Sequence, residues 1–481
     1  GFDENIVPDN RVYPAHATPG VNRGYMKGVL DDSLRLVDFT AACGPLLFNS
    51  YAYGKDYYDN AFVAEPSANL IKRNILSYAI DSTHGREAYK NKEFLASTDE
   101  RFRPVNLYAG TDGAMYVVDM YRGISQHKTY LTPYLAGEVM KRGLEQPLNC
   151  GRIYKIVPDG INLPVPVFNR NADSLLSYLN SPNQWLRQTA HDLIVDEQLT
   201  SIVPALKMML RSDTLQTGRI NALWVLEGLN ELHNNDLLAT WQNSAVMLKQ
   251  QILTAAIAIM KNKQDADFWI NKYPGMMNEN ISGLAPYLAY LGASALQYSR
   301  AANDILIKTA VKYKGNNYVA DAVISGLHDK EIPFLKRYTE TVKDTSDALI
   351  HLSKTVIENA DKQKLAASAN KNMDKNLLAG KQLFKVNCQV CHGDDGNGIK
   401  GLGAPLNESN WVQGDKTTLL SVVLYGLTGP IKVGDKTYQP PDVAGAMPGM
   451  NTNDKLTNQD VAYIVSYIRK AWNNKAGVIT E

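Results

Sequence analysis

The chain has few cysteines, no excess charge of either sign and no long apolar run. Its 481 residues include only four cysteines, and 50 basic side chains are balanced by 49 acidic ones. This balance gives no net field to attract nucleic acid or an anionic membrane surface. No stretch reaches the roughly 20 apolar residues that span a bilayer. Gly1 to Asn5 lack the basic and apolar regions of a signal peptide, so we expect any export signal or lipid anchor to precede them.

Two of the four cysteines stand next to a histidine, in Cys388-Gln389-Val390-Cys391-His392. Two thiols at this spacing can add to the two vinyl groups of one haem, and the adjacent imidazole can then bind the iron. The alternative is a redox or zinc site, but zinc would require a second pair of ligands, and no other cysteine pair of this kind exists. The motif therefore predicts one covalent haem c and single-electron transfer outside the cytoplasm.

The surroundings of the motif support a haem-binding domain. Residues 378–384 have helical apolar spacing and lead directly into it. The glycines of 393–403 predict a loop that can wrap closely around a flat macrocycle. Residues 457–472 predict an amphipathic helix, with Thr457 and Asp460 as its capping start. We expect the two helices to pack against each other.

The iron needs a sixth ligand, for which the sequence offers Met447 and Met450. Residues 371–475 resemble the monohaem class I cytochromes c, in which the distal methionine usually precedes a proline. This resemblance selects Met447, followed by Pro448, and leaves Met450 as the fallback. The alternative role for either methionine is to fill a gap in the core. Ligation of the iron by histidine and methionine implies a comparatively high potential, suited to accepting electrons.

The same resemblance implies two further residues beside the haem. In this family the proximal imidazole often forms a hydrogen bond with a proline carbonyl, and Pro405 occupies the matching place after His392. Trp411 is expected to neighbour a haem propionate. A methionine-ligated iron has no open position for a substrate, which disfavours a peroxidase-like enzyme.

The length of the chain predicts two to four domains, because one core rarely serves so many residues. We expect a sheet-rich domain at 1–160, an all-helical domain at 172–360 and the cytochrome domain at 377–475. Residues 361–376 are rich in lysine, alanine, serine and asparagine, which is typical of a solvated linker or helix end.

The helical domain carries a faint internal repeat. Arg187 and Ala190 recur 32 residues later as Arg219 and Ala222. This period is typical of helix pairs stacked in a HEAT-like solenoid, whose shared face is buried only by stacking. We expect a spacer or docking surface, and its isolated histidines predict no ligand role.

The first 160 residues predict short strands rather than helices. Apolar runs bounded by turn residues occur at 61–64, 69–73, 114–119 and 151–156. Asp112-Gly113 supplies a turn just before the third of these runs. This pattern is typical of propeller blades, in which four-stranded sheets repeat radially.

Residues 102–107, 112–119 and 150–154 resemble the end of a propeller related to the quinoprotein sugar dehydrogenases. The whole chain resembles bacterial multidomain proteins, regarded as membrane-bound dehydrogenases, that join such a propeller to HEAT-like repeats and a C-terminal monohaem cytochrome c. The resemblance implies a sugar or alcohol dehydrogenase that uses pyrroloquinoline quinone and calcium in the propeller. It also implies a redox partner in the periplasm or cell envelope, with an association with the outer membrane as one option.

The chain departs from this family in the size of its sheet region. About 160 residues provide only two to three blades, whereas closed propellers need four or more. We expect a missing N-terminal segment, or a second chain, to complete the ring and cover its open edges. Arg103, Arg122 and His127 lie in strand-connecting regions and could line a central pocket. Structural or surface roles are favoured for them, so no catalytic residue is assigned.

Cys43 and Cys150 lie near opposite ends of the sheet-rich region. Covalent haem attachment implies an oxidising compartment, and ring folds bring distant strands together, so we predict a disulfide between them. The alternative is two buried free thiols.

Two functions follow from these features. The first is the cytochrome-bearing part of a periplasmic dehydrogenase that oxidises a sugar or another alcohol. The second is a non-catalytic electron carrier or scaffold subunit of a cell-envelope complex. Reduction of the haem by a substrate distinguishes them, since only a dehydrogenase shows it.

Overall fold

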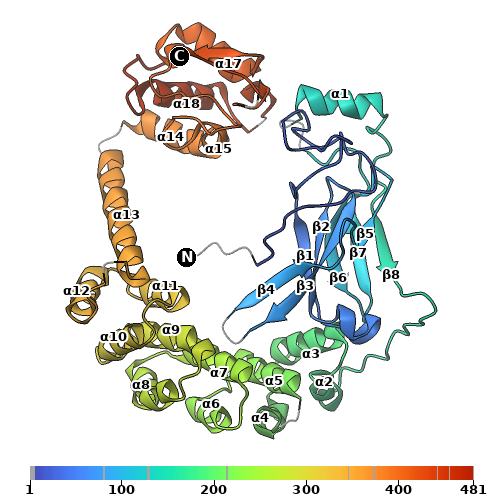
Figure 1. The fold of residues 1–481 in the computed structure, drawn as a ribbon, viewed down its shortest axis with the longest axis vertical. Coiled ribbons are helices and arrows are strands. Elements are labelled where there is room, and N and C mark those ends of the chain that lie inside the picture. Colours follow the sequence, from blue (N-terminus) through green and yellow to red (C-terminus); the bar gives the residue numbers. More distant parts are fainter. Residues whose placement is uncertain are drawn as a thin grey trace.

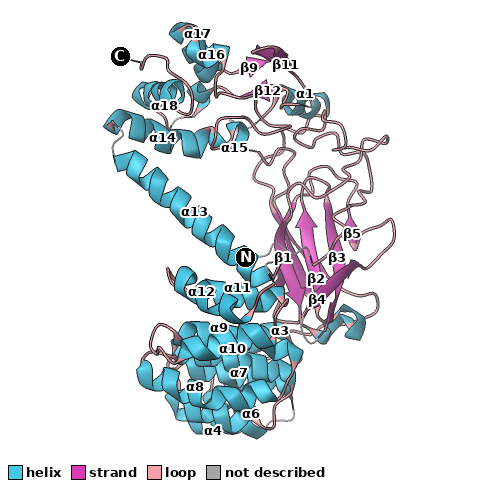
Figure 2. Ribbon diagram, turned by 60° about the vertical axis from the view of Figure 1, so that its left-hand side comes forward, coloured by secondary structure: helices cyan, strands magenta, loops and turns pink. Residues whose placement is uncertain are grey.

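The computed structural model describes residues 6–479, apart from 80–81, 127–130, 213–214, 345, 372–373, 441 and 454. A sheet-rich N-terminal region, a long stack of helices and a C-terminal helical domain follow one another around an arc (Figure 1). The two ends of the arc approach each other, because helix α1 (Pro133–Lys141) lies beside the C-terminal domain in both ribbon views (Figure 2).

The N-terminal region contains two antiparallel sheets. The first has the order β1-β2-β3-β4, with β5 also pairing β3, and the second has the order β6-β7-β8. The strands are β1 (Cys43–Phe48), β2 (Asn60–Glu65), β3 (Leu70–Tyr78), β4 (Thr83–Glu87), β5 (Leu95–Ala96), β6 (Pro104–Ala109), β7 (Met115–Asp119) and β8 (Arg152–Ile156). The strands predicted at 61–64, 69–73, 114–119 and 151–156 are therefore confirmed. Over the described residues the two sheets form no closed barrel or ring.

The core of this region lies between the two sheets. Every second residue of β7 is buried, as expected for a strand that faces another layer on one side. Buried side chains from both sheets form one cluster, namely Phe48, Phe62, Ile71, Phe102, Leu107, Met115 and Val117. A smaller cluster, Val12, Val21, Leu36, Ala68 and Leu70, joins the N-terminal segment to the first sheet.

The predicted disulfide between Cys43 and Cys150 is contradicted by this topology. Both are free thiols, and Cys43 Sγ contacts the Pro104 carbonyl at 3.8 Å, whereas Cys150 Sγ contacts the Leu148 carbonyl at 3.4 Å. Strand β7 separates the two, because Asp119 pairs with Pro104 on one side and with Arg152 on the other. Two strand spacings, about 10 Å in all, separate β6 from β8, so the two thiols lie near opposite edge strands of the second sheet.

The middle of the chain is all-helical, as predicted. Its helices are α2 (Ala172–Tyr178), α3 (Gln184–Asp196), α4 (Val203–Ser212), α5 (Gln216–Gly228), α6 (Asn234–Trp241), α7 (Val246–Ile259), α8 (Lys263–Asn278), α9 (Ala285–Ala295), α10 (Ala302–Lys312), α11 (Asn317–Ser325), α12 (Glu331–Thr341) and α13 (Ala348–Lys371). Helices α3, α5, α7 and α9 form an inner row and α2, α4, α6, α8 and α10 an outer row (Figure 1). One continuous apolar core joins the stack. Because α13 runs to Lys371, residues 361–371 of the predicted linker are helical.

The repeated residues have matching structural roles. Ala190 and Ala222 are fully buried in the shared core. Arg187 donates to the Ser181 carbonyl at 2.6 Å, in the turn before its helix, and Arg219 donates to the Leu210 carbonyl at 2.9 Å. Each arginine thus fastens its helix to the preceding segment, which explains why this residue type recurs.

The sheets and the helical stack are joined by side-chain to backbone hydrogen bonds. Arg187 Nη2 donates to the Asn49 carbonyl at 2.7 Å, and the Asn49 amide donates to Gln184 Oε1 at 2.9 Å. Asn183 Nδ2 donates to the Thr111 carbonyl at 2.8 Å. These contacts attach the start of α3 to loops at one end of both sheets.

The C-terminal domain is built around two crossing helices. Its elements are α14 (Lys375–Asn387), α15 (Gln389–His392), α16 (Asn410–Gln413), α17 (Lys416–Tyr425), β9 (Leu427–Thr428), β10 (Ile431–Val433), β11 (Lys436–Tyr438), β12 (Ala446–Met447) and α18 (Asn458–Lys470). A capping box of Thr457 and Asp460 begins α18, as predicted. The crossing is close at Gly380, where a Cβ would lie 2.0 Å from the Tyr463 carbonyl oxygen.

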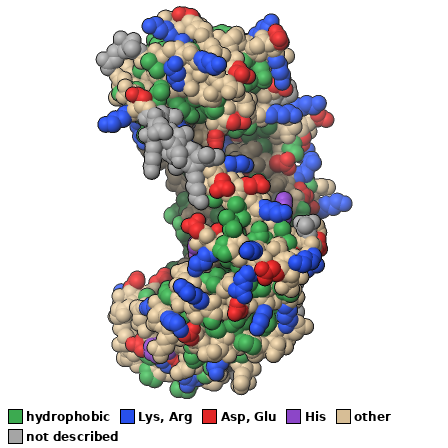
Figure 3. Space-filling view, turned by 90° about the vertical axis from the view of Figure 1, so that its left-hand side faces the viewer, with side chains coloured by type: hydrophobic (Ala, Val, Ile, Leu, Met, Phe, Trp, Pro, Cys, Tyr) green, Lys and Arg blue, Asp and Glu red, His purple; other side chains and the backbone are tan. Residues whose placement is uncertain are grey.

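The surface of the described residues carries charges of both signs. None of the described helices combines the length and apolarity needed to cross a membrane. Basic and acidic side chains are interspersed over the face seen in Figure 3, from the C-terminal domain to the helical stack. This distribution agrees with the balanced charge of the sequence.

Candidate haem site

The cysteines of the motif are delivered by the end of α14. Asp374 caps this helix by accepting from the Asn376 and Leu377 amides, and the helix ends at Asn387, directly before Cys388. The amides of Cys391 and His392 both donate to the Cys388 carbonyl at 3.1 Å, which makes one tight turn of the motif. Both thiols and the imidazole are therefore held on a single short segment.

The cysteine thiols lie in a partly buried setting. Burial raises the pKa of Cys388 to about 12 and also raises the pKa of Cys391. A structural zinc site has four ligands. The described residues contain no group of three or more His, Cys, Asp or Glu side chains placed to hold a metal ion. The zinc alternative therefore has no support in the geometry.

His392 is oriented as a metal ligand. Its Nδ1 lies 2.8 Å from the Ala404 carbonyl oxygen, so that nitrogen carries the hydrogen and Nε2 keeps its lone pair. Burial lowers the pKa of His392, and the bond to Ala404 opposes this shift. A buried neutral imidazole with a free Nε2 is the form that binds iron.

The acceptor for His392 is Ala404 and not Pro405, which corrects the prediction by one residue. Pro405 acts indirectly. A proline disfavours the α region for the residue before it and holds that residue extended, which fixes the direction of the Ala404 carbonyl. The family resemblance therefore indicated the correct turn, but the imidazole hydrogen bond is accepted by the residue before Pro405.

The glycine-rich loop folds back onto the motif, and its wrapping around the haem stays a prediction. The Gly398 amide donates to the His392 carbonyl at 2.9 Å, and the Ile399 amide donates to the Cys391 carbonyl at 3.1 Å. A Cβ at Gly403 would lie 2.6 Å from the Cys391 carbonyl oxygen, so only glycine permits this approach. The loop therefore leaves a space beside the motif that side chains at its glycine positions would occupy.

The two candidate methionines lie in different environments. Met450 is only 8% exposed and belongs to the core cluster of the domain, beside Val412 and Leu419. Met447 is partly buried at the edge of the same cluster, as is Cys388. Met447 is held by pairing of β12 with β9, opposite Leu427. The core-filling role therefore fits Met450, and the choice of Met447 as the axial ligand stays a prediction.

Trp411 has its hydrogen-bond donor occupied. Its Nε1 donates to the Lys432 carbonyl at 2.8 Å, and the indole has no second donor. Trp411 can therefore lie beside a propionate only through its ring, and the predicted neighbourhood remains a prediction.

The residues suggested for a central pocket in the sheets do not converge on one. Arg103 is buried, and its guanidinium donates to the carbonyls of Pro66, Arg122 and Gly123. Burial lowers the pKa of Arg103 to about 10. Arg122 contributes a backbone carbonyl to this network, and His127 lies outside the described residues. The structural role favoured for Arg103 is confirmed.

The family comparisons agree with this geometry. Residues 377–472 match the family described as cytochrome c. The C-terminal domain is a cytochrome c domain. Residues 6–160 match a family described as a domain of unknown function, DUF7133. The haem-binding geometry and the cytochrome c match together fit a covalent haem c.

Similar curated proteins are subunits of larger assemblies. The cytochrome c subunit of alcohol dehydrogenase (quinone) from Gluconobacter oxydans (strain 621H) is 35% identical over 99 residues, which covers 20% of this chain and 19% of that protein. The corresponding subunit from Gluconacetobacter polyoxogenes is 32% identical over 105 residues, 21% of each chain. Subunit CcoP of the cbb3-type cytochrome c oxidase from Cereibacter sphaeroides (strain ATCC 17023) is 29% identical over 134 residues, 27% of this chain and 39% of that protein. The chain thus spans about a fifth to two fifths of these relatives.

The chain is therefore a haem c-containing electron-transfer protein. Cys388, Cys391 and His392 lie together on one tight turn and remain the residues predicted to attach the haem and to bind its iron. When bound, the haem supplies the one-electron chemistry, while the protein orients it and sets its potential through the axial ligands and their hydrogen bonds.

Proposed function

We propose that this chain is the cytochrome-bearing part of an exported dehydrogenase that oxidises a sugar or another alcohol. The observation that carries the proposal is the cytochrome c domain, whose curated relatives include the cytochrome c subunits of alcohol dehydrogenase (quinone). Electrons from the oxidised substrate would reach the haem one at a time and leave to a respiratory partner in the cell envelope.

In this proposal the axial ligands are His392 and Met447, with Met450 as a core residue. Ala404 holds the imidazole in the neutral form that binds iron, and β9 holds the strand that carries Met447. A thioether ligand favours reduced iron relative to a second imidazole, which raises the potential. The site is therefore suited to accepting electrons.

The two N-terminal sheets are proposed to be blades of an incomplete β-propeller, followed by a HEAT-like solenoid at 172–360. Meander order in both sheets supports the first part, and the two rows of helices with one shared core support the second. Strand β8 is exposed along most of its length, and Ile153 is 71% exposed. Another segment or chain that pairs with this edge would complete the ring and supply the sites for pyrroloquinoline quinone and calcium.

The exposed β8 edge also favours a second candidate, a non-catalytic electron carrier docked in a larger complex. An open strand edge presents unpaired backbone groups that a partner strand can satisfy. In that case the sheets would bind a partner that carries the substrate site.

The deciding experiment records the visible spectrum of the purified oxidised chain before and after addition of sugars and alcohols. Pyrroloquinoline quinone and calcium are supplied in parallel, and a Cys388→Ser/Cys391→Ser variant without covalent haem is the control. The proposal predicts that the reduced-haem band appears with a particular substrate. If dithionite reduces the haem but no substrate does, the chain has the second candidate function, that of a non-catalytic electron carrier.

A further inference from the structure

The N-terminal region contacts the cytochrome domain through Tyr25. The Gly445 amide donates to the Tyr25 hydroxyl at 2.9 Å, although the two residues are 420 positions apart. The contact includes the ring of Tyr25, because a Cβ built on Gly445 would lie 3.2 Å and 3.4 Å from its Cε2 and Cζ. A side chain at position 445 would therefore press directly on Tyr25.

Gly445 lies between the two loops that flank the haem site. The Ala444 amide donates to the Leu402 carbonyl at 3.1 Å, in the glycine-rich loop that folds back on the cysteine motif. On the other side, Met447 pairs with Leu427 in the β12-β9 ladder. The Tyr25 hydroxyl thus contacts the segment that joins the histidine side of the site to the methionine side.

Tyr25 packs against its own domain. Its ring packs edge-on against Tyr134 of α1, with centroids 5.4 Å apart, and the Tyr134 hydroxyl donates to the Pro19 carbonyl at 3.0 Å. The Leu36 amide donates to Thr18 Oγ1 at 2.8 Å, which anchors the preceding loop to a buried residue. Arg23 has a positive φ of 67°, a turn that brings the chain to Tyr25.

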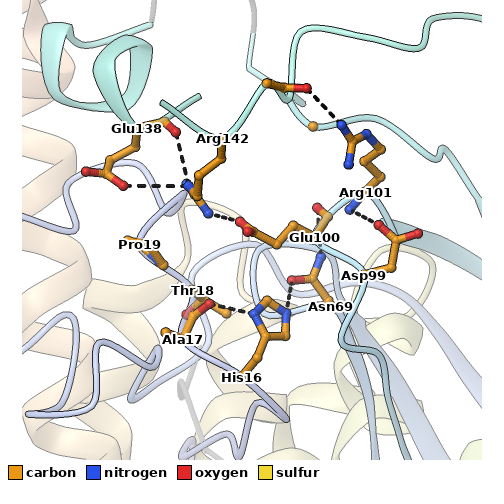
Figure 4. A network of polar contacts seen from close by, with 12 residues as sticks. His16, Ala17, Thr18, Pro19, Asn69, Asp99, Glu100, Arg101, Glu138 and Arg142 are labelled. Carbon is orange, nitrogen blue, oxygen red and sulfur yellow. Dashed lines mark hydrogen bonds and ion pairs between the residues drawn. The ribbon is translucent and has the colours of Figure 1, made fainter. Parts of the chain in front are cut away.

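A polar network fixes the same loop from the other side. Arg142 at the end of α1 forms ion pairs with Glu138 and Glu100, and His16 lies beside Asn69 at the start of β3 (Figure 4). These contacts connect the loop, α1 and the first sheet into one unit. Tyr25 is therefore placed by these contacts, and it can in turn position the cytochrome segment that contains Gly445.

The loop that carries Tyr25 is supported by α1, through the contact between the rings of Tyr25 and Tyr134. Both ribbon views show α1 beside the cytochrome domain (Figures 1 and 2).

We propose that Tyr25 is a positioning residue for the haem, which holds the Met447 loop from the N-terminal domain and so couples the two domains. The effect on iron ligation rests on the proposed role of Met447, whereas the contact itself does not. Through this contact, a change in the N-terminal domain that displaces Tyr25 releases the Met447 loop and so changes the ligation of the iron.

The test uses the full haem-loaded chain and the Tyr25→Phe variant, which loses only the hydroxyl. We expect a weaker methionine-to-iron charge-transfer band in the oxidised spectrum. At a fixed poise the ratio of oxidised to reduced haem should rise about threefold, which corresponds to roughly 30 mV for a one-electron couple. Tyr108→Phe, at an exposed tyrosine of β6, is the matched control and should change neither quantity.

A pair of variants shows whether the effect passes through this contact. Gly445 has no positive φ, so Gly445→Ala adds no backbone strain of its own, and its Cβ meets Tyr25. Gly445→Ala should shift the potential in the natural background and lose most of that effect in a Tyr25→Ala background. Equal shifts in both backgrounds would overturn the proposal.

Hydrogen exchange separates failure of this inference from failure of the Met447 assignment. The contact predicts faster exchange of the Gly445 amide in Tyr25→Phe than in the unaltered chain, whichever residue binds the iron. If the unaltered chain shows no methionine band but exchange at Gly445 accelerates, the Met447 assignment fails and the domain contact stands. If exchange, spectrum and potential are all unchanged by Tyr25→Phe, the positioning role is wrong.

Discussion

The Nδ1 atom of His392 lies 2.8 Å from the carbonyl oxygen of Ala404 and donates its hydrogen to it. This bond fixes the tautomer of the ligand and increases its basicity, which stabilises oxidised iron. The carbonyl belongs to a residue whose conformation is restricted by the following Pro405. Pro405 does not bind the haem itself. It influences the potential of the iron through the Ala404 carbonyl.

We expect Pro405→Ala to raise the haem midpoint potential. Without the proline the Ala404 carbonyl can turn away, and the imidazole loses part of its hydrogen bond. A net hydrogen bond of about 0.5–1.5 kcal/mol corresponds to a rise of roughly 20–60 mV. Redox titration of the visible spectrum measures it, with Pro430→Ala, at an exposed loop position, as the control. A potential equal to that of the control would show that the proline does not set the bond.

The two methionines should respond differently to the same change. Met447→Leu should remove the methionine-to-iron charge-transfer band and lower the potential, because leucine has no lone pair for the iron. Met450→Leu should keep the band and cost less than about 1.5 kcal/mol of stability, since the change conserves volume in a core position. The oxidised spectra of both variants decide the matter, and the opposite pattern would make Met450 the ligand.

The crossing of α14 and α18 predicts a large loss of stability in Gly380→Ala. The new Cβ would lie 2.0 Å from the Tyr463 carbonyl oxygen, in a contact between backbones that a rotamer change cannot relieve. We expect a loss of about 1–3 kcal/mol or more in urea unfolding monitored at the haem. Gly477→Ala, whose Cβ meets nothing within 4 Å, is the control in the same domain. Similar stabilities of the two variants would contradict the close crossing.

The sequence predicted the parts of this molecule that depend on local patterns. The capping box of Thr457 and Asp460 begins a helix as expected, because both groups act within one turn. The motif at Cys388 to His392 likewise carries its chemistry in five adjacent residues. The cytochrome domain could therefore be predicted nearly to its boundaries.

Contacts that depend on tertiary placement were missed or wrong. The disulfide between Cys43 and Cys150 failed because β7 lies between them, which no count of residues reveals. The acceptor of His392 is a backbone carbonyl, and every residue has one, so sequence alone could not choose Ala404 over its neighbour. Nothing in the sequence indicated the contact of Tyr25 with the cytochrome domain, since its partner Gly445 lies 420 residues further on.

The N-terminal sheets should lose stability as the pH rises, through Glu93. Burial raises the pKa of Glu93 to about 7, although nearby Lys72 and the Tyr13 amide lower it. Between the unfolded value of about 4.5 and the folded value, the folded chain holds a proton that the unfolded chain has lost, so stability falls as pH increases through this window. A pKa that differs by one between the folded and unfolded chain corresponds to about 1.36 kcal/mol, and partial exposure of the side chain reduces the total to about 1–2 kcal/mol.

Glu93→Gln should remove this pH dependence and stabilise the domain at pH values above the window. The amide keeps an oxygen to accept from the Tyr13 amide, which Glu93 Oε1 accepts at 3.1 Å, but carries no charge to desolvate. Scanning calorimetry of the full chain at several pH values between about 5 and 8 measures the effect on the transition of the N-terminal domain. Glu145→Gln, at an exposed position of the same domain, should leave the profile unchanged. If Glu93→Gln and the unaltered chain lose stability in parallel over this range, another group governs the pH dependence.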